Sequence, residues 1–556
     1  MSLRPIPVPP IPEATVRVAR AAFRKGCLAM RVRDELGPLF CDEQFVSAFP
    51  RRGGPALSPA QLAMVSVLQF AEGLTDRQAA DAVRARIDFK YCLGLDLDDP
   101  GFDVSVLSEF RDRLIVHGLE EQVLDIVLER LSGLGLLRAG GRQRTDATHV
   151  LAAVRAVNRM EFVGETMRAA LEALAAAVPG WLADITRQHL AWEKRYAARC
   201  DSYRIPKGDN AREEWARTVG EDGFALLEAV HAPGTPPWLR EIPAVQVLRT
   251  TWIQQYHRDG GEVRWREGKD LPPGRIRILS PYDVQARYSV KRGTGWVGYK
   301  VHFSEVCEPD TPHVITNVAT TDATVQDTEM TDRVHQALHK RKLLPAEHLV
   351  DCGYTSASLL VQARDEYHVN LLGPLRTDTS SQKRQTPEVA QEAFTIDWDG
   401  HRVTCPQGHT SAVWSAQRHN IRGVPIVQVF FRREHCDACP LREACTRTTN
   451  PRYGRGLQIL ARPLQEAQDA RRREEQTDEF KDRYAMRAGA EGTISQAVRR
   501  SRVRTTPYIG LAKTHLGHVF TATALNLVRL DAWWNGRPLG ATRTSHFSQL
   551  SLSLAA

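Results

Sequence analysis

Three acidic residues stand in contexts where a charged side chain needs an explanation. Asp146 lies within a strand-like stretch, Asp351 follows a short apolar segment, and Glu491 lies in a helix-like stretch. Carboxylate oxygens are ligands that Mg²⁺ prefers, and two such ions about 3.5 to 4 Å apart activate both the attacking and the leaving oxygen of a phosphodiester. The three acids therefore predict a two-metal site for phosphoryl transfer, provided that the fold brings them together.

The third acid shares its helix with other functional groups. At 100° per residue, one side of the helix expected over residues 484–500 carries an aromatic ring, a base, an acid and a hydroxyl, from Tyr484, Arg487, Glu491 and Ser495. This face would present all four groups to a neighbouring element.

Each acid also has an ordinary structural interpretation. Asp146 could cap a strand end, Asp351 could start a turn, and Glu491 could form an ion pair with Arg487 one helical turn away. Taken singly, these interpretations are preferred, and only the order strand, strand, helix favours a site. Three other acids rank lower because they fall in loop-like contexts: Asp283, Asp322 and Asp327.

A second candidate site is a group of four cysteines, Cys405, Cys436, Cys439 and Cys445. The last three have the spacing C-x2-C-x5-C, which suits tetrahedral structural zinc, and His409 or His435 could replace one ligand. With four protein ligands the zinc would have no open position and would stabilise its module. The alternative is four unpaired buried cysteines, and the other six of the chain's ten cysteines are interpreted as ordinary thiols.

The elements that must hold the acids have the pattern of a mixed sheet. Residues 298–303 and 313–318 are expected to form an antiparallel pair. A strand over 347–351, a helix over 356–366 and a strand over 368–373 form a βαβ unit, whose strands are parallel. Asp351 would then be the last residue of its strand, at the edge where functional atoms of such sheets gather.

Capped helices dominate the N-terminal part. Ser58 opens one that stops at Gly73, Thr75 opens the next, and a third is expected from Asp103 to Leu114. A helix-turn-helix that binds DNA has this pattern, but so has any helical hairpin in a bundle. The arginines around the second helix slightly favour DNA binding. The candidate residues for contacts with DNA are Arg77, Arg84 and Arg86.

Changes of composition along the chain predict several units. They are a Pro-rich arm at 1–20, a helical DNA-binding domain at 21–135, an α/β catalytic domain whose parts are 136–160, 280–375 and 456–535, a helical insertion at 161–279, a β-rich insertion at 376–455 and a flexible tail at 536–556.

Three motifs resemble those of bacterial insertion-sequence transposases of the DDE class. Tyr484, two residues, Arg487, three residues and Glu491 match the motif of the third acid, while the contexts of Asp146 and Asp351 look like those of the first two. In the family a lysine follows the glutamate after six intervening residues, and here Val498 stands at that position. The candidates for its phosphate contact are Arg499 and Arg502.

The resemblance implies an RNase H-like catalytic domain that holds two Mg²⁺ ions with Asp146, Asp351 and Glu491. Arg487 and Tyr484 would hold phosphate or orient Glu491. The implied activity is a nick at the element end, whose 3′-hydroxyl then attacks target DNA. The implied partners are double-stranded DNA, namely terminal inverted repeats and target DNA, and a second copy of the chain.

Composition allows this function and two others. A net charge of +8 favours a polyanionic partner, and the absence of an apolar run of roughly 18 residues predicts a cytoplasmic, nucleoid-associated protein. A non-catalytic DNA-binding regulator predicts that the three acids do not converge. A zinc hydrolase predicts an open coordination position at the cysteines.

Overall fold

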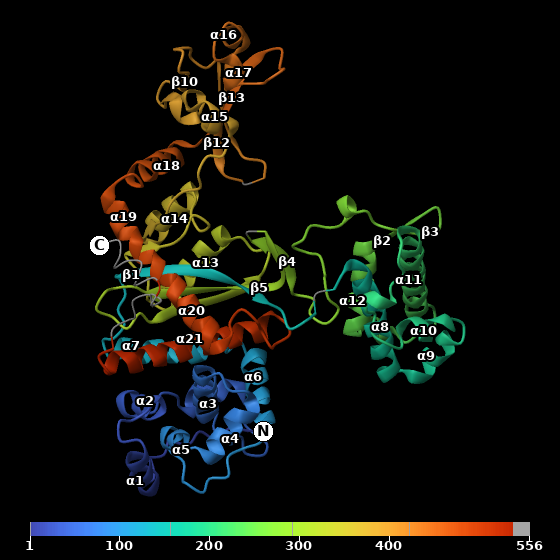
Figure 1. Ribbon diagram of the computed structural model, residues 1–556, viewed down its shortest axis with the longest axis vertical. Coiled ribbons are helices and arrows are strands. Elements are labelled where there is room, and N and C mark those ends of the chain that lie inside the picture. The colour runs from blue at the N-terminus through green and yellow to red at the C-terminus, as the bar shows by residue number, and fades with distance from the viewer. Residues whose placement is uncertain (1, 156, 292, 422, 538–546, 548–556) are drawn as a thin grey trace.

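A six-stranded mixed sheet forms the centre of the computed structural model, which describes residues 2–155, 157–291, 293–421, 423–537 and 547 (Figure 1). The strand order is β4-β5-β1-β7-β8, with β6 paired to β5. Neighbours β4, β5, β6 and β1 are antiparallel, whereas β1–β7 and β7–β8 are parallel. The strands are β1 Arg142–Leu151, β4 Arg287–Lys291, β5 Thr294–Val306, β6 Ile315–Asp322, β7 Glu347–Leu349 and β8 Asn370–Leu372.

Both sheet motifs expected from the sequence are confirmed. Strands β5 and β6 pair antiparallel, and β7, helix α14 (Ala357–Tyr367) and β8 form the parallel βαβ unit. The position of Asp351 is corrected, because β7 ends at Leu349 and Asp351 lies in the turn beyond it. Between β6 and β7 the chain forms η5 (Asp327–Glu329) and α13 (Met330–Lys340).

The N-terminal helices follow their local capping signals. The Ser58 hydroxyl caps α3, Gly73 ends it with a left-handed conformation, and Thr75 and Gln78 form the capping box of α4. The arm expected at 1–20 is helical from Glu13 onwards. The elements are α1 Glu13–Ala22, α2 Leu28–Leu36, η1 Asp42–Ala48, α3 Pro59–Glu72, α4 Asp76–Ala85, α5 Ile87–Leu93, α6 Ser105–Val116 and α7 Gln122–Gly133.

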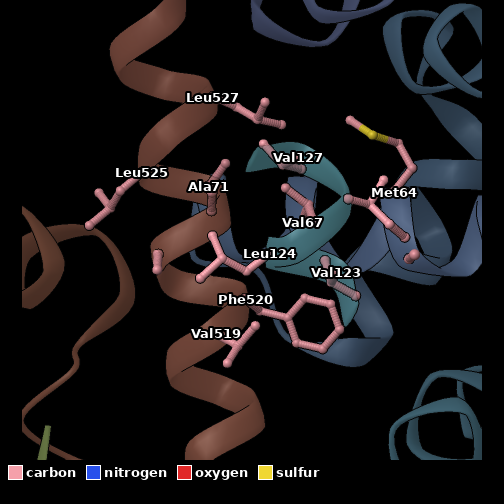
Figure 2. Close-up of a cluster of buried hydrophobic side chains, with 14 of the residues drawn as sticks. Met64, Val67, Ala71, Val123, Leu124, Val127, Val519, Phe520, Leu525 and Leu527 are labelled. Carbon is pink, nitrogen blue, oxygen red and sulfur yellow. The ribbon is translucent and has the colours of Figure 1, made fainter. Parts of the chain in front are cut away.

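Helix α21 (Leu511–Trp534) lies between the sheet and the N-terminal helices (Figure 1). Its Phe520 and Leu527 pack against Val67 of α3 and Val127 of α7 (Figure 2). The same buried cluster continues into the sheet through Val301. The C-terminal helix therefore joins the first and middle thirds of the chain into one core.

The helical insertion has a core of its own around Trp192, Trp252 and Tyr256. Glycine is required at 223, because a Cβ there would lie 2.0 Å from Cε2 of Trp252. A hairpin of β2 and β3 ends this insertion, which sequence analysis had expected to be helical throughout. Its elements are α8 Arg159–Ala177, α9 Pro179–Thr186, α10 Ala191–Tyr196, η2 Ser202–Arg204, α11 Asp209–His231, η3 Pro237–Glu241, α12 Pro243–Gln255, β2 Tyr256–Asp259, β3 Glu262–Trp265 and η4 Gly268–Asp270.

A β-rich module lies at the far end of the molecule from the N-terminal helices (Figure 1). Its core contains Phe394, Val429 and Phe431. The elements of this module are α15 Ser381–Gln385, η6 Pro387–Val389, η7 Gln391–Ala393, β9 Thr395–Asp397, β10 Arg402–Thr404, β11 Val413–Arg418, β12 Pro425–Arg432, α16 Arg433–Asp437, α17 Arg442–Cys445 and β13 Tyr453–Leu460.

Four helical segments lead from the β-rich module back to α21: α18 Arg462–Glu474, α19 Asp478–Ala485, η8 Met486–Ala488 and α20 Gly489–Ser501. The helix expected over residues 484–500 is confirmed in extent, since each of these residues is helical, but the 3₁₀ turn η8 divides it into α19 and α20. The flexible tail expected at 536–556 lies almost entirely outside the described residues. Within the part of the chain that is described, no helix is long and apolar enough to cross a membrane.

Candidate active site

The guanidinium of Arg487 joins the three acids that sequence analysis singled out. Its Nη2 lies 2.9 Å from Oδ2 of Asp146 and 3.5 Å from Oδ2 of Asp351. Its Nη1 lies 3.9 Å from Oε1 of Glu491. One charged side chain thus comes to the candidate site from each of four segments: β1, the turn after β7, η8 and α20.

The three acids differ in their exposure to solvent. The side chain of Asp146 is 12% exposed and that of Asp351 33%, whereas that of Glu491 is 76% exposed. Burial raises the pKa of the Asp146 carboxyl above its ordinary value, although the Arg487 guanidinium opposes this shift. A carboxylate in this position is therefore stabilised by a neighbouring cation, and Glu491 lies at the open rim.

Tyr484 lies beside the acids but belongs to another helix than Glu491. Its ring stacks on Phe480 with the centroids 5.6 Å apart, in a small cluster with Leu349 and Leu372 of the sheet. Burial raises the pKa of its hydroxyl. Tyr484 therefore packs α19 against the strand end that precedes Asp351.

Asp327, ranked low from the sequence, lies at the same place. A Cβ on Gly353 would lie 2.8 Å from Oδ1 of Asp351 and 3.2 Å from Oδ2 of Asp327, so glycine lets the two acids approach. Lys300 Nζ pairs with Oδ1 of Asp327 at 3.1 Å. Asp327 was ranked low because of its loop-like context, whereas its place in the site depends on its contact with Lys300 of β5.

The other two acids of low rank have structural roles. Asp283 accepts a hydrogen bond of 2.7 Å from the Tyr299 hydroxyl and is buried. Asp322 accepts one of 2.8 Å from the backbone N–H of Thr324. Their low rank agrees with these contacts.

The donor set fits a hard divalent cation. Asp146 and Asp351 offer only oxygens and already share one positive charge, that of Arg487. Among the described residues, no group of three or more His, Cys, Asp or Glu side chains is arranged to hold a metal ion. In the structure, the Arg487 guanidinium supplies the positive charge beside Asp146 and Asp351.

Comparisons with known proteins add to this geometry. Residues 404–531 match the family model described as a transposase DDE domain, and residues 22–113 match the one described as a transposase domain (DUF772). The two matches support a DDE-class transposase of an insertion sequence. No curated protein and no solved structure gave a significant match.

The DDE match covers only part of the candidate site. It includes Tyr484, Arg487 and Glu491 and ends within α21. Asp146 and Asp351 precede it and enter the site through the contacts with Arg487. Proteins of this class use a divalent metal in general.

The arginines expected to contact DNA fall into two groups. Arg84 bonds to the carbonyl oxygens of Pro100 and Phe102, and Arg86 pairs with Glu72 and Asp88, so both are bound by the chain's own groups although their side chains are partly exposed. The other three are exposed on α4, on α20 and at the end of α20: Arg77, Arg499 and Arg502.

The four cysteines line one cavity of about 30 Å³, together with His409 and His435. The backbone N–H of Arg455 points at Sγ of Cys436, at 3.4 Å. Burial raises the pKa of the Cys445 thiol, and the other three thiols add to this shift while Arg455 opposes it. The four side chains therefore gather as expected, but they do not form a metal-binding group in the described residues.

Proposed function

We propose that this transposase binds the ends of an insertion sequence and carries out metal-dependent cleavage and transfer of DNA strands. The observation that carries the proposal is the convergence of Asp146 and Asp351 on Arg487 from separate elements, with Glu491 one helical turn beyond Arg487. The two transposase matches support it, and one of them includes Arg487 and Glu491. A non-catalytic regulator predicts dispersed acids and is not favoured.

The sheet supports an RNase H-like catalytic domain. The antiparallel strands β6, β5 and β1 continue into the parallel strands β7 and β8. The first acid lies on the central strand β1, the second follows its neighbour β7, and the third is on a helix that packs against β1. This is the order of acids that the resemblance implies.

Asp146 and Asp351 would hold the metal ions and Glu491 would complete the set from the rim. Two Mg²⁺ ions, when bound, would activate the attacking and the leaving oxygen of the phosphodiester. Arg487, released from the acids, would offer its planar fork of N–H donors to a phosphate. Hydrolysis would leave a 3′-hydroxyl on the element end, which attacks target DNA by transesterification at the same site.

Substitution of the exposed acid tests this proposal. We expect Glu491→Gln to cut DNA from the element end at least about 100-fold more slowly in Mg²⁺, because an interaction worth several kcal/mol in the transition state is lost. The matched control is Glu479→Gln, which changes an acid on α19 that is 81% exposed. Equal loss in both variants, or none in either at unchanged DNA binding, would contradict the proposal.

We propose that two copies act together on DNA, since two element ends must be brought to one reaction. Light scattering of the chain with and without a DNA duplex carrying one end measures this. A mass of two chains with two duplexes is expected, whereas one chain on one duplex at all concentrations would refute it.

For the cysteine cavity we propose a structural zinc ion bound by Cys405, Cys436, Cys439 and Cys445. The support is that all four line one cavity and that a backbone N–H is directed at Cys436 Sγ. Elemental analysis of the purified chain should find about one zinc per chain, lost in Cys436→Ser, with DNA cleavage in Mg²⁺ retained. Zinc at unchanged content in that variant would exclude this ligand set.

A further inference from the structure

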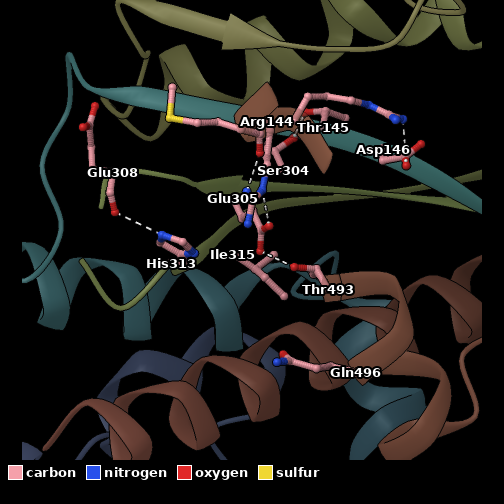
Figure 3. Close-up of polar contacts among 12 residues, drawn as sticks. Arg144, Thr145, Asp146, Ser304, Glu305, Glu308, His313, Ile315, Thr493 and Gln496 are labelled. Atoms are coloured by element: carbon pink, nitrogen blue, oxygen red, sulfur yellow. Dashed lines mark hydrogen bonds and ion pairs between the residues drawn. The ribbon is translucent and has the colours of Figure 1, made fainter. Parts of the chain in front are cut away.

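A buried carboxylate in β5 lies beneath the candidate active site. Glu305 is 1% exposed and pairs in register with Arg144 of β1, two residues before Asp146. Figure 3 shows it between the strand that carries Arg144 and the helix that carries Thr493. A charge removed from water in this way requires close partners.

Three donors surround this carboxylate. Arg144 Nε donates to Oε1 over 2.6 Å, while Arg529 Nη1 and the Thr493 hydroxyl donate to Oε2 over 2.6 and 2.5 Å. Burial opposes ionisation, but the guanidinium groups of Arg529 and Arg144 outweigh it and hold the pKa of Glu305 below its ordinary value. Glu305 is therefore an anion shared between β1, α20 and α21.

The donors also fix both sides of the segment that carries Arg487 and Glu491. Arg144 Nη1 donates to the carbonyl of Met486 over 2.6 Å, immediately before Arg487. Thr493, two residues after Glu491, accepts from Arg529 Nη2 over 2.6 Å.

The start of α20 packs closely on the same guanidinium. A Cβ on Gly489 would lie 2.0 Å from Nη1 of Arg144, so only glycine fits at this point of contact. The segment 486–493 is thus held at its beginning, at Gly489 and at its end.

We infer that Glu305 is a positioning residue, which sets Arg487 and Glu491 against Asp146 through Arg144 and Thr493. The inference rests on the proposed function, because it concerns the same site. It assigns Glu305 no contact with DNA or metal. Loss of the link should loosen the helix that carries the third acid, and should weaken metal binding more than DNA binding.

Removal of Glu305 itself would leave two arginines buried without their anion and could unfold the chain. The test therefore uses Thr493→Val, which keeps the shape and removes only the hydroxyl on the helix side. Thr493→Ser restores a hydroxyl. The matched control is Thr523→Val, because Thr523 of α21 is equally buried and its hydroxyl bonds only to the carbonyl of Val519, one turn away.

Two quantities are measured: Mn²⁺ binding to the full chain by calorimetry, and the rate of single-turnover cleavage of DNA that carries the element end. Both are normalised to the fraction of folded protein. We expect Thr493→Val to weaken Mn²⁺ binding about 10-fold and to shift cleavage to higher metal concentration, as loss of a partner behind a metal ligand does. Thr493→Ser and Thr523→Val should stay within about twofold of the unchanged chain on the same scale.

Two failures are distinguishable. If the unchanged chain neither binds Mn²⁺ nor cuts DNA, the proposed function falls and the inference with it. If the unchanged chain does both but Thr493→Val equals Thr523→Val in metal binding and cleavage, Glu305 is only a structural residue and the inference is overturned.

Discussion

At the scale of single residues, the site depends on opposite charges held in contact. The types and order of Asp146, Asp351 and Glu491 were visible in the sequence, because each acid interrupts or follows a regular pattern. Asp327 was ranked low and Glu305 was not singled out, because their positions come from the contacts of β5 with η5 and α20. Their signal exists only in three dimensions.

Replacing Arg487 should expose the repulsion between the acids that it joins. We expect Arg487→Gln to lower the free energy of unfolding by about 1–3 kcal/mol without metal, because the buried Asp146 carboxylate loses its partner. Added Mg²⁺ should recover more stability in this variant than in the unchanged chain, since the cation replaces the missing charge. Urea unfolding with and without Mg²⁺ measures both, and an equal gain in the two proteins would argue against a shared cation position.

A buried histidine next to the site predicts a pH dependence. Burial lowers the pKa of His302 to about 4, and its Nδ1 lies 2.6 Å from the Tyr354 hydroxyl. As pH falls, the unfolded chain binds a proton on His302 before the folded chain does, which lowers the free energy of unfolding. The folded state therefore keeps its full stability above pH 6.5 and loses the part linked to His302 as pH falls towards 4.

At pH 5 this loss amounts to about 2 kcal/mol relative to pH 8. Between pH 8 and pH 5, we expect the free energy of unfolding of His302→Gln to fall by about 2 kcal/mol less than that of the unchanged chain. Equal slopes in urea titrations of the variant and the unchanged chain would show that His302 is not the group responsible.

At the scale of elements, local signals were sufficient where the cause is local. The caps at Ser58 and Thr75 were predicted correctly, because each is satisfied within its own turn. The helix expected over 484–500 tightens into the 3₁₀ turn η8, where the Met486 carbonyl accepts from the Gly489 N–H, three residues on, and also from Arg144. The periodicity of the sequence predicted the helix but not this tertiary contact at the turn.

The packing of α11 on α12 gives a test of the helical insertion. We expect Gly223→Ala to destabilise it by about 1–3 kcal/mol, because the added methyl overlaps Trp252. Gly180→Ala on α9 is the control, since nothing lies within 4 Å of its Cβ position. Hydrogen exchange should show faster opening of α11 in the first variant alone, and identical exchange in both would disprove the packing.

At the scale of the whole molecule, α21 connects regions that are far apart in the sequence. Its Phe520 and Leu527 lie in one cluster with Val67 (Figure 2), and the same cluster contains Val301 of the sheet. The composition of the chain indicated separate units but not this shared core, because nothing local shows which helix covers which face. The matches at 22–113 and 404–531 therefore meet in one folded body.

Truncation of that core should affect both regions together. We expect Phe520→Ala to cost about 3–5 kcal/mol and to speed hydrogen exchange in α3 and in β5 alike. Exchange that rises in one of them and stays unchanged in the other would contradict a common core.

The central claim is that Asp146 and Asp351 hold the metal ions that cut DNA, and the most direct measurement is single-turnover cleavage of element-end DNA by preformed complexes. The unchanged chain should cut only when Mg²⁺ is added, and Asp146→Asn and Asp351→Asn should bind the same DNA without cutting it. Cleavage that survives in either variant, or that proceeds equally in a metal chelator, would contradict the account.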